Sequence, residues 1–292
     1  MRYSVFDTHC DTLCSVLDGG KSINSNDCHV DIKRMKEYEN YTQVFACFID
    51  PIYRDSAVER TLKLIDTYHQ STNNLPENVH AMLSIEGGEG ITSLSMLRNY
   101  HRLGVKIAAL TWNFSNHIAS GAFEKDNQRG LTDFGKTVVK EMNNLGMFID
   151  VSHLNRKSFY DIASISQMPI IATHSCSDSV CSHVRNITDD QFRIIKESGG
   201  CVGINFYPDF LTEERECSAQ DIVRHINHFM ELGGEDNIGI GADFDGVDKL
   251  PNGISGVQDM YKVFDRLKKE GYTDVQIEKI SHKNFERVLE RK

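Results

Sequence analysis

Short apolar runs recur along the whole chain, separated by longer polar stretches. The runs are rich in Val, Ile and Phe, and they show no regular alternation of apolar and polar residues. Continuous apolar runs of this kind are typical of parallel strands that are buried on both faces. Eight strands are therefore predicted, at residues 5–9, 44–49, 81–85, 107–111, 147–151, 170–173, 201–205 and 238–242.

The segments between these runs carry apolar residues three or four positions apart, which is the period of an amphipathic helix. Thr132 or Asp133 is able to cap one such helix, and Gly146 is able to end it. Thr273 with Gln276 three positions later matches a capping box at the start of another. Helices are predicted at residues 57–70, 133–145, 188–198, 218–232, 256–270 and 273–289.

The alternation of strand and helix predicts the fold. Strand followed by helix eight times is the signature of a (β/α)8 TIM barrel, and a doubly wound sheet is the alternative. No internal repeat or low-complexity linker interrupts the pattern, so residues 1–292 are predicted to form one domain. His225 and His228 lie three positions apart on the predicted helix 218–232, and we expect both on its solvent side without a role in a site.

The charge of the chain narrows the class of partner. Its 292 residues carry a formal net charge of −10, whereas nucleic acids and anionic membranes bind basic surfaces, so neither is expected as a partner. No run is long and apolar enough to cross a bilayer, and no hydrophobic signal core precedes the first strand, so a cytoplasmic location is expected. The eight cysteines include no CxxC pair and are expected to be free thiols.

Metal-binding side chains stand at the ends of five predicted strands. In a barrel the chemistry gathers where the strands end, so these side chains are expected to form one site. Any one of them alone is more often structural, but the joint pattern favours a metal centre. They are His9 and Asp11 at the first strand, Glu86 at the third, His153 at the fifth, His174 at the sixth and Asp243 at the eighth.

These residue types fit a pair of metal ions. His9 and Asp11 lie two positions apart, so both point to one face and are able to hold one metal. His153 and His174 make a second pair of ligands, and the single carboxylate of Glu86 is able to bridge two metals. Two metals lower the pKa of a water between them and polarise a carbonyl, which is what hydrolysis requires.

Two further residues complete this hypothesis. Asp243, preferred over Asp245, is placed to take a proton from that water and to hand it to a leaving nitrogen. Arg185 follows the sixth strand and is placed to hold a substrate carboxylate in a bidentate pair. A salt bridge to a neighbouring helix is the alternative for this arginine.

Eight motifs resemble those of the membrane dipeptidase (renal dipeptidase) family, in family order and over nearly the whole chain. They lie at residues 6–11, 84–88, 130–135, 146–153, 173–175, 183–186, 203–207 and 241–246. The resemblance implies an amidohydrolase-type barrel that cleaves dipeptides, with C-terminal D-residues among the candidate substrates. Since secretion and anchor signals are missing, the chain resembles a soluble bacterial-type member.

The same resemblance implies a cofactor and a role for each site residue. Two zinc ions are expected per chain, and a hydroxide between them would attack the peptide carbonyl. By this resemblance His9 and Asp11 bind one zinc, His153 and His174 bind the other, Glu86 bridges the two, Arg185 binds the C-terminal carboxylate and Asp243 transfers the proton.

The chain departs from this family after the fourth predicted strand. The mammalian members have Leu-Thr-His there, whereas this chain has Leu110-Thr111-Trp112-Asn113. Trp112 is unable to accept a proton, although its indole N–H donates a hydrogen bond. Trp112, Asn113 and Tyr207 are expected to contact the substrate. The polar loop at residues 115–130 is expected to cover the site and to restrict it to short substrates.

Two other functions fit the same residues. One is another amide hydrolase of this fold, such as an N-acyl amino acid deacylase or a lactamase-like enzyme, because those substrates also offer Arg185 a carboxylate. The other is a metal-binding relative that has lost turnover, which Trp112 favours. Exposed barrel helices often mediate a homodimer, but no face of these helices stands out for that role.

Overall fold

The strands form one closed parallel barrel. The structure is a computed structural model that describes residues 3–124 and 128–290. The strand order is β6-β5-β4-β3-β2-β1-β8-β7, and Ala172, just past β6, pairs with Val202 of β7 and so closes the ring. The predicted (β/α)8 barrel is confirmed. The strands are β1 (Ser4–Cys10), β2 (Asn40–Phe48), β3 (Val79–Glu86), β4 (Val105–Ala109), β5 (Phe148–Asp150), β6 (Ile170–Ile171), β7 (Val202–Ile204) and β8 (Ile238–Ile240).

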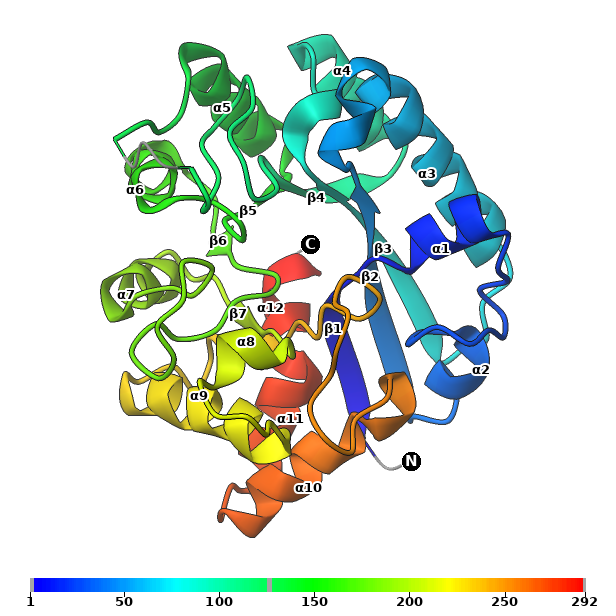
Figure 1. The fold of residues 1–292 in the computed structure, drawn as a ribbon, viewed down its shortest axis with the longest axis vertical. Helices are drawn as coiled ribbons and strands as arrows, with labels where there is room; N and C mark the ends of the chain where they lie inside the picture. Colours follow the sequence, from blue (N-terminus) through cyan, green and yellow to red (C-terminus); the bar gives the residue numbers. More distant parts are fainter. Residues whose placement is uncertain (1–2, 125–127, 291–292) are drawn as a thin grey trace.

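Helices surround this barrel on the outside, as Figure 1 shows. They supply the crossover connections that neighbouring parallel strands require. The α-helices are α1 (Thr12–Gly19), α2 (Ile32–Met35), α3 (Ala57–Thr72), α4 (Leu94–Arg102), α5 (Asp133–Leu145), α6 (Arg156–Ile165), α7 (Asp189–Glu197), α8 (Pro208–Leu211), α9 (Ala219–Glu231), α10 (Tyr261–Lys269), α11 (Asp274–Glu278) and α12 (Asn284–Leu289). Short 3-10 turns η1 (Pro51–Ser56), η2 (Gly88–Gly90) and η3 (Val257–Asp259) and a π-helical turn η4 (Lys279–Lys283) complete the secondary structure.

The capping signals in the sequence act as predicted. The Thr132 side chain accepts a hydrogen bond from the Gly135 N–H at the start of α5, and Gly146 ends the same helix with φ of 69°. Thr273 and Gln276 form the capping box that begins α11. These caps satisfy backbone groups that a helix end leaves without intrahelical partners.

The long helix predicted at residues 273–289 is wrong in one respect, because η4 interrupts it between α11 and α12. A π turn holds one extra residue, which changes the direction in which the following side chains point. Asn284 begins α12 and donates to the carbonyl oxygens of Glu235 (2.9 Å) and Ile238 (2.8 Å). The interruption therefore coincides with the place where the helix is tied to β8.

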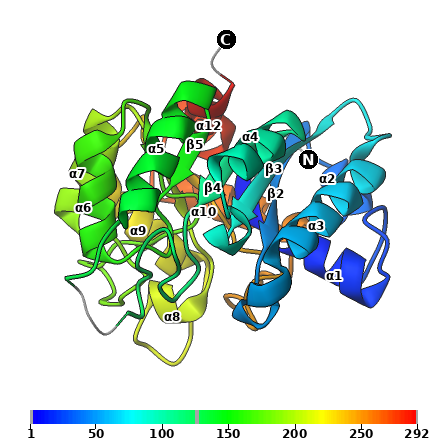
Figure 2. The ribbon, with the colours of Figure 1, turned by 90° about the horizontal axis from the view of Figure 1, so that it is seen from above.

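Helix α12 fills one end of the barrel. Its residues Phe285 and Val288 are buried among inward-facing strand residues that include Phe6, and the Phe6 and Phe285 rings stack with centroids 6.1 Å apart. A side chain on Gly239 of β8 would overlap the Phe285 ring. Helix α12 lies in the centre of the ring in Figure 1 and at the opposite end of the barrel from α8 in Figure 2. The other end of the barrel, where the strands have their carboxyl ends, is not filled by α12.

The prediction for His225 was wrong. This residue is fully buried, and its Nδ1 accepts a hydrogen bond from the Ser177 N–H at 3.0 Å. Its Nε2 therefore carries the proton and donates to the Leu211 carbonyl, also at 3.0 Å, and burial lowers the pKa of His225 to about 4. Position 225 belongs to the apolar face of α9, which the buried Ile222 and Phe229 define. His228 is half-buried and lies 2.8 Å from Asp189.

Two predictions from composition also agree with the structure. Among residues 3–124 and 128–290, no helix has the length and apolar character needed to span a membrane. All eight cysteines lie in these ranges, and none of them forms a disulfide bond.

Candidate active site

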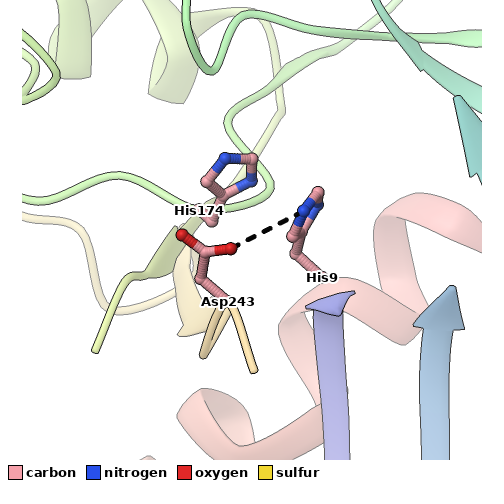
Figure 3. Close-up of side chains that lie close together, drawn as sticks. All are labelled: His9, His174 and Asp243. Carbon is pink, nitrogen blue, oxygen red and sulfur yellow. Dashed lines mark ion pairs between the residues drawn. The ribbon is translucent and has the colours of Figure 1, made fainter. Parts of the chain in front are cut away.

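Six of the predicted site residues meet at the carboxyl ends of the strands. His9 lies in β1 and Glu86 ends β3, while Asp11, His153, His174 and Asp243 follow β1, β5, β6 and β8. All six are at most 8% exposed. Figure 3 shows the side chains of His9, His174 and Asp243 converging, with Oδ1 of Asp243 3.8 Å from Nε2 of His9. The predicted clustering is present in the fold.

Glu86 stands between two pairs of ligands. Its Oε2 is 3.5 Å from His9 Nε2, and that nitrogen is 3.3 Å from Asp11 Oδ2. Its Oε1 is 2.6 Å from His153 Nε2 and 3.5 Å from His174 Nε2. Each carboxylate oxygen therefore faces a different pair, and the ligand atoms within each group lie within 4.8 Å of one another. This geometry fits two metal ions that share one carboxylate.

The hydrogen bonds of His153 and His174 leave the Nε2 atoms of both rings without a proton. His153 Nδ1 donates to Asn113 Oδ1 at 2.9 Å. Thr173 Oγ1 donates to Asp150, so it accepts the Nδ1–H of His174 at 2.8 Å. Both Nε2 atoms then present lone pairs, and these two atoms are only 2.7 Å apart. Lone pairs this close to each other and to a carboxylate favour a proton or a metal cation between them, and imidazole with carboxylate is a ligand set that suits zinc.

Burial sets the protonation of the cluster. Burial lowers the pKa of His153 to about 4, and the Arg185 guanidinium adds to the decrease. Burial raises the pKa of Asp243 to about 7, where His9 opposes the rise and the carboxylates of Asp11 and Glu86 increase it. When carboxylates are crowded in this way, ionising all of them costs much free energy unless positive charge lies beside them. The electrostatics therefore also fit a metal site.

Three residues reach these positions through unusual backbone conformations. His153 (φ 67°), Asp243 (φ 62°) and Asp245 (φ 66°) are the non-glycine residues with positive φ in the described chain. Such conformations cost free energy and persist where the surrounding structure imposes them. Gly246 follows, and a Cβ there would overlap the carboxylates of Asp11 and Asp243. The turn after β8 is thus shaped around these two carboxylates.

Asp245 has a different environment from Asp243. Its Oδ2 accepts from Thr12 Oγ1 and its Oδ1 accepts from the His29 N–H, both at 2.6 Å. Asp243 instead has Oδ1 toward His9, and its Oδ2 accepts from Asn205 Nδ2 at 2.8 Å. Both oxygens of Asp245 are committed to holding neighbouring segments, whereas one oxygen of Asp243 faces the ligand cluster.

A cavity of about 590 Å3 opens over the ligand cluster. The predicted substrate-contact residues Trp112, Asn113, Arg185 and Tyr207 all line it. Phe123, from the predicted covering loop 115–130, lines it as well, whereas residues 125–127 of that loop lie outside the described residues. A second cavity of about 620 Å3 lies over α3, away from these ligands. The site cavity is large enough for a small substrate.

Arg185 is the cationic end of this cavity. The residue is 4% exposed, and its Nη2 is buried without a hydrogen-bond partner among the described residues. Its guanidinium carbon lies 5.5 Å from the centre of the Phe210 ring. A buried guanidinium with a free donor is expensive unless an anion binds it. This donor is therefore available to an anion in the cavity.

The sequence did not indicate the supporting roles of three residues that hold the site side chains in place. Asn113 orients His153, Asn205 holds Asp243, and Asp150 fixes Thr173, which orients His174. Asp150 and Asn205 are polar residues at or just past the end of an apolar run, and this position is the signal that was available. Asn113 is predicted to contact the substrate and lines the cavity; its Oδ1 is also bonded to His153, which the sequence did not indicate.

Asn113→Ala is expected to weaken metal binding by about 10- to 100-fold, which is the usual effect of losing the partner that orients a metal-binding histidine. Without Oδ1 of Asn113, the His153 ring is free to rotate and to change tautomer. Metal affinity would be measured by competition with a chromogenic chelator. Asn116→Ala serves as a comparison, because Asn116 bonds to backbone groups of its own loop. Equal metal affinity in the wild type and Asn113→Ala would contradict this role.

The closed barrel and the ligand cluster at its carboxyl ends define a metal-dependent hydrolase of the TIM-barrel class. The model of the family described as membrane dipeptidase (Peptidase family M19) matches residues 1–292. The chain belongs to this family, and it is a metallo-dipeptidase, a hydrolase that acts on peptide bonds.

Relatives in sequence and structure agree with this membership. An uncharacterized protein of Klebsiella pneumoniae from the pqqA 5′ region is 36% identical over 224 residues, which are 73% of this chain and 82% of that protein. An uncharacterized dipeptidase of Schizosaccharomyces pombe is 34% identical over 281 residues, 94% of this chain and 67% of that protein. A metallo peptidase of Rhodobacter sphaeroides, liganded with a phosphinate mimic of L-Ala-D-Ala, has a TM-score of 0.89 at 27% identity and covers 99% of both chains. Dipeptidase AC of family M19 has a TM-score of 0.90 at 28% identity, over 99% of this chain and 98% of that one.

Proposed function

We propose that this chain hydrolyses dipeptides at two zinc ions held by His9, Asp11, Glu86, His153 and His174. The observation that carries the proposal is the pair of Nε2 lone pairs of His153 and His174, 2.7 Å apart and both facing Glu86. Two zinc ions at these ligands would lower the pKa of a water and polarise the peptide carbonyl. The membership of a dipeptidase family supports the same assignment.

The protein side chains would place the dipeptide and move the proton. Arg185 would bind the C-terminal carboxylate through its free donor, which brings the scissile carbonyl over the ligand cluster. Asp243, held through Oδ2 by Asn205, would take the proton of the attacking water on Oδ1. It would then pass this proton to the amine nitrogen as the C–N bond breaks, so that one water is consumed and two amino acids leave.

The stereochemistry of the second residue is part of the proposal. The Rhodobacter sphaeroides neighbour is liganded with a mimic of L-Ala-D-Ala. This ligand supports acceptance of a C-terminal D-residue by this chain as well. The proposal also includes a single domain over residues 1–292, which the pairing of β1 with both β2 and β8 supports.

The test is hydrolysis of a dipeptide panel by chelator-stripped protein with and without added zinc, with metal content counted in the untreated protein. We expect cleavage that zinc restores, about two metals per chain and turnover of L-Ala-D-Ala. N-acyl amino acids and lactams are run in parallel. Cleavage of only these would replace the proposal by another amide hydrolase, and bound metal without any turnover would make the chain a metal-binding relative. Absence of bound metal would overturn the metal site itself.

A further inference from the structure

The cavity has an aromatic wall on one side that the proposed chemistry does not use. Phe48, the last residue of β2, and Trp112, just past β4, both line the cavity. Their rings meet edge to face with centroids 5.4 Å apart. The Trp112 ring is also 6.4 Å from the ring of His153, so this wall begins at the edge of the ligand cluster. Both aromatic residues are half-buried and so keep part of their surface open.

Arg185 lies on the other side of the barrel mouth. It belongs to the loop after β6, and in the strand order β6-β5-β4-β3-β2-β1-β8-β7 the strand β2 is four places from β6. Four places in a ring of eight is the opposite side. By strand order Phe48 therefore lies opposite Arg185, with the ligand cluster lining the same cavity. Trp112 follows β4, two places from β6, and joins Phe48 through the contact of their rings.

This arrangement fixes how a dipeptide would lie, if the proposed function holds. Its carboxylate would sit at Arg185 and its scissile carbonyl at the ligand cluster. The N-terminal residue would then extend to the far side, toward Phe48 and Trp112. No lysine or arginine other than Arg185 lines the cavity among the described residues, so a reversed dipeptide would find no cation for its carboxylate.

We propose that Phe48 and Trp112 form the subsite for the side chain of the N-terminal residue and that this subsite selects apolar side chains. Edge-to-face aromatic rings offer a large apolar surface that gains from covering another apolar group. The carboxylates of Asp11, Asp245 and Asp248 also line the cavity and would disfavour an acidic side chain there. The expected order of N-terminal residues is Leu and Phe above Ala, Ala above Gly, and Glu last.

The first test is the ratio of kcat/KM for Leu-Ala to that for Gly-Ala in the zinc-loaded wild type. A hydrophobic pocket discriminates by about tenfold or more for a side chain of this size, so a ratio of at least about ten is expected. Trp112→Ala should lower the ratio to about three or less. Phe210→Ala is the matched control, since Phe210 is an aromatic residue of the same cavity whose ring lies 5.5 Å from the guanidinium carbon of Arg185. It should leave the ratio as in the wild type, whatever it does to both rates.

A second readout does not depend on turnover. Trp112 is the single tryptophan of the chain, so intrinsic fluorescence reports on this subsite alone. Titration of the zinc-loaded protein with a phosphinate mimic of Leu-Ala should shift the emission to shorter wavelength, because the ligand side chain removes water from the indole. The mimic of Gly-Ala should shift it much less.

The outcomes separate this subsite from the proposed function. If the wild type cleaves no dipeptide, the proposed function fails and the subsite fails with it. If the wild type cleaves Leu-Ala and Gly-Ala equally well, the subsite is overturned while the dipeptidase proposal stands. The same conclusion follows if Trp112→Ala lowers both rates by the same factor, or if both mimics shift the emission equally. The wild-type ratio needs no variant, so a misfolded Trp112→Ala would not obscure the result.

Discussion

Glu86→Gln is expected to remove at least one of the two metal ions and to lower kcat/KM for a dipeptide by about a thousandfold or more. The carboxylate of Glu86 has one oxygen toward His9 and the other toward His153. An amide has lost the negative charge and offers only one oxygen, so it is unable to serve both sides. Metal polarisation of a carbonyl supplies several kcal/mol, and each 1.4 kcal/mol or so is tenfold in rate.

Metal content after dialysis and kcat/KM in excess zinc would measure this effect. Glu89→Gln is the matched control, because Glu89 is also a buried glutamate, in the turn η2 just past β3, but belongs to none of the ligand groups. It should keep both metals. A Glu86→Gln protein with two metals and near wild-type activity would remove Glu86 from the site.

Asp243→Asn is expected to keep the metals and to lower kcat by about 100- to 10,000-fold, the range that general acid–base catalysis supplies. The amide is isosteric and still able to accept from Asn205, so the loop after β8 should keep its shape. It is unable to take a proton from water or to deliver one to the amine. Pre-steady-state and steady-state rates, together with metal counts, would separate lost chemistry from lost metal.

Asp245→Asn gives the comparison for this loop. The Asp245 carboxylate holds Thr12 and the backbone of His29, so its loss should lower the melting temperature and affect kcat far less than Asp243→Asn does. If Asp245→Asn proved the more damaging of the two for kcat, the proton-transfer role would move to Asp245. A fall of less than tenfold in Asp243→Asn would remove that role from Asp243.

The pattern of apolar runs was sufficient to predict the barrel, because buried parallel strands have a composition that does not depend on their partners. The ligand cluster followed from the same pattern, since in such a barrel the carboxyl ends of all strands lie on one face. His9, Glu86 and His174 are far apart in the sequence, and their meeting required only the topology. The roles of these residues remain a prediction until metal binding is measured.

Other features depend on contacts that no local pattern encodes. The helical spacing of Ile222 and Phe229 puts position 225 on the apolar face of α9, so its burial was available from the pattern. Its hydrogen bonds with the Ser177 and Leu211 backbones were not, because they depend on segments distant in the sequence. Asn113 follows a strand and so reads as a neighbour of the substrate, whereas its bond to His153 joins residues 40 positions apart, and the positive φ of His153 has no signal in the sequence. The spacing of apolar residues and the positions of strand ends do not reveal which distant residues form hydrogen bonds with each other.

The position of α12, which fills one end of the barrel, has a consequence for folding during synthesis. A ribosome synthesises all eight strands before it reaches Phe285 and Val288, which fill the floor of the barrel. A nascent chain that carries every strand still lacks these side chains, and Phe6, near its start, lacks the ring on which it stacks. The barrel interior is therefore completed late, and stalling translation before residue 285 should yield a chain that a protease cleaves readily.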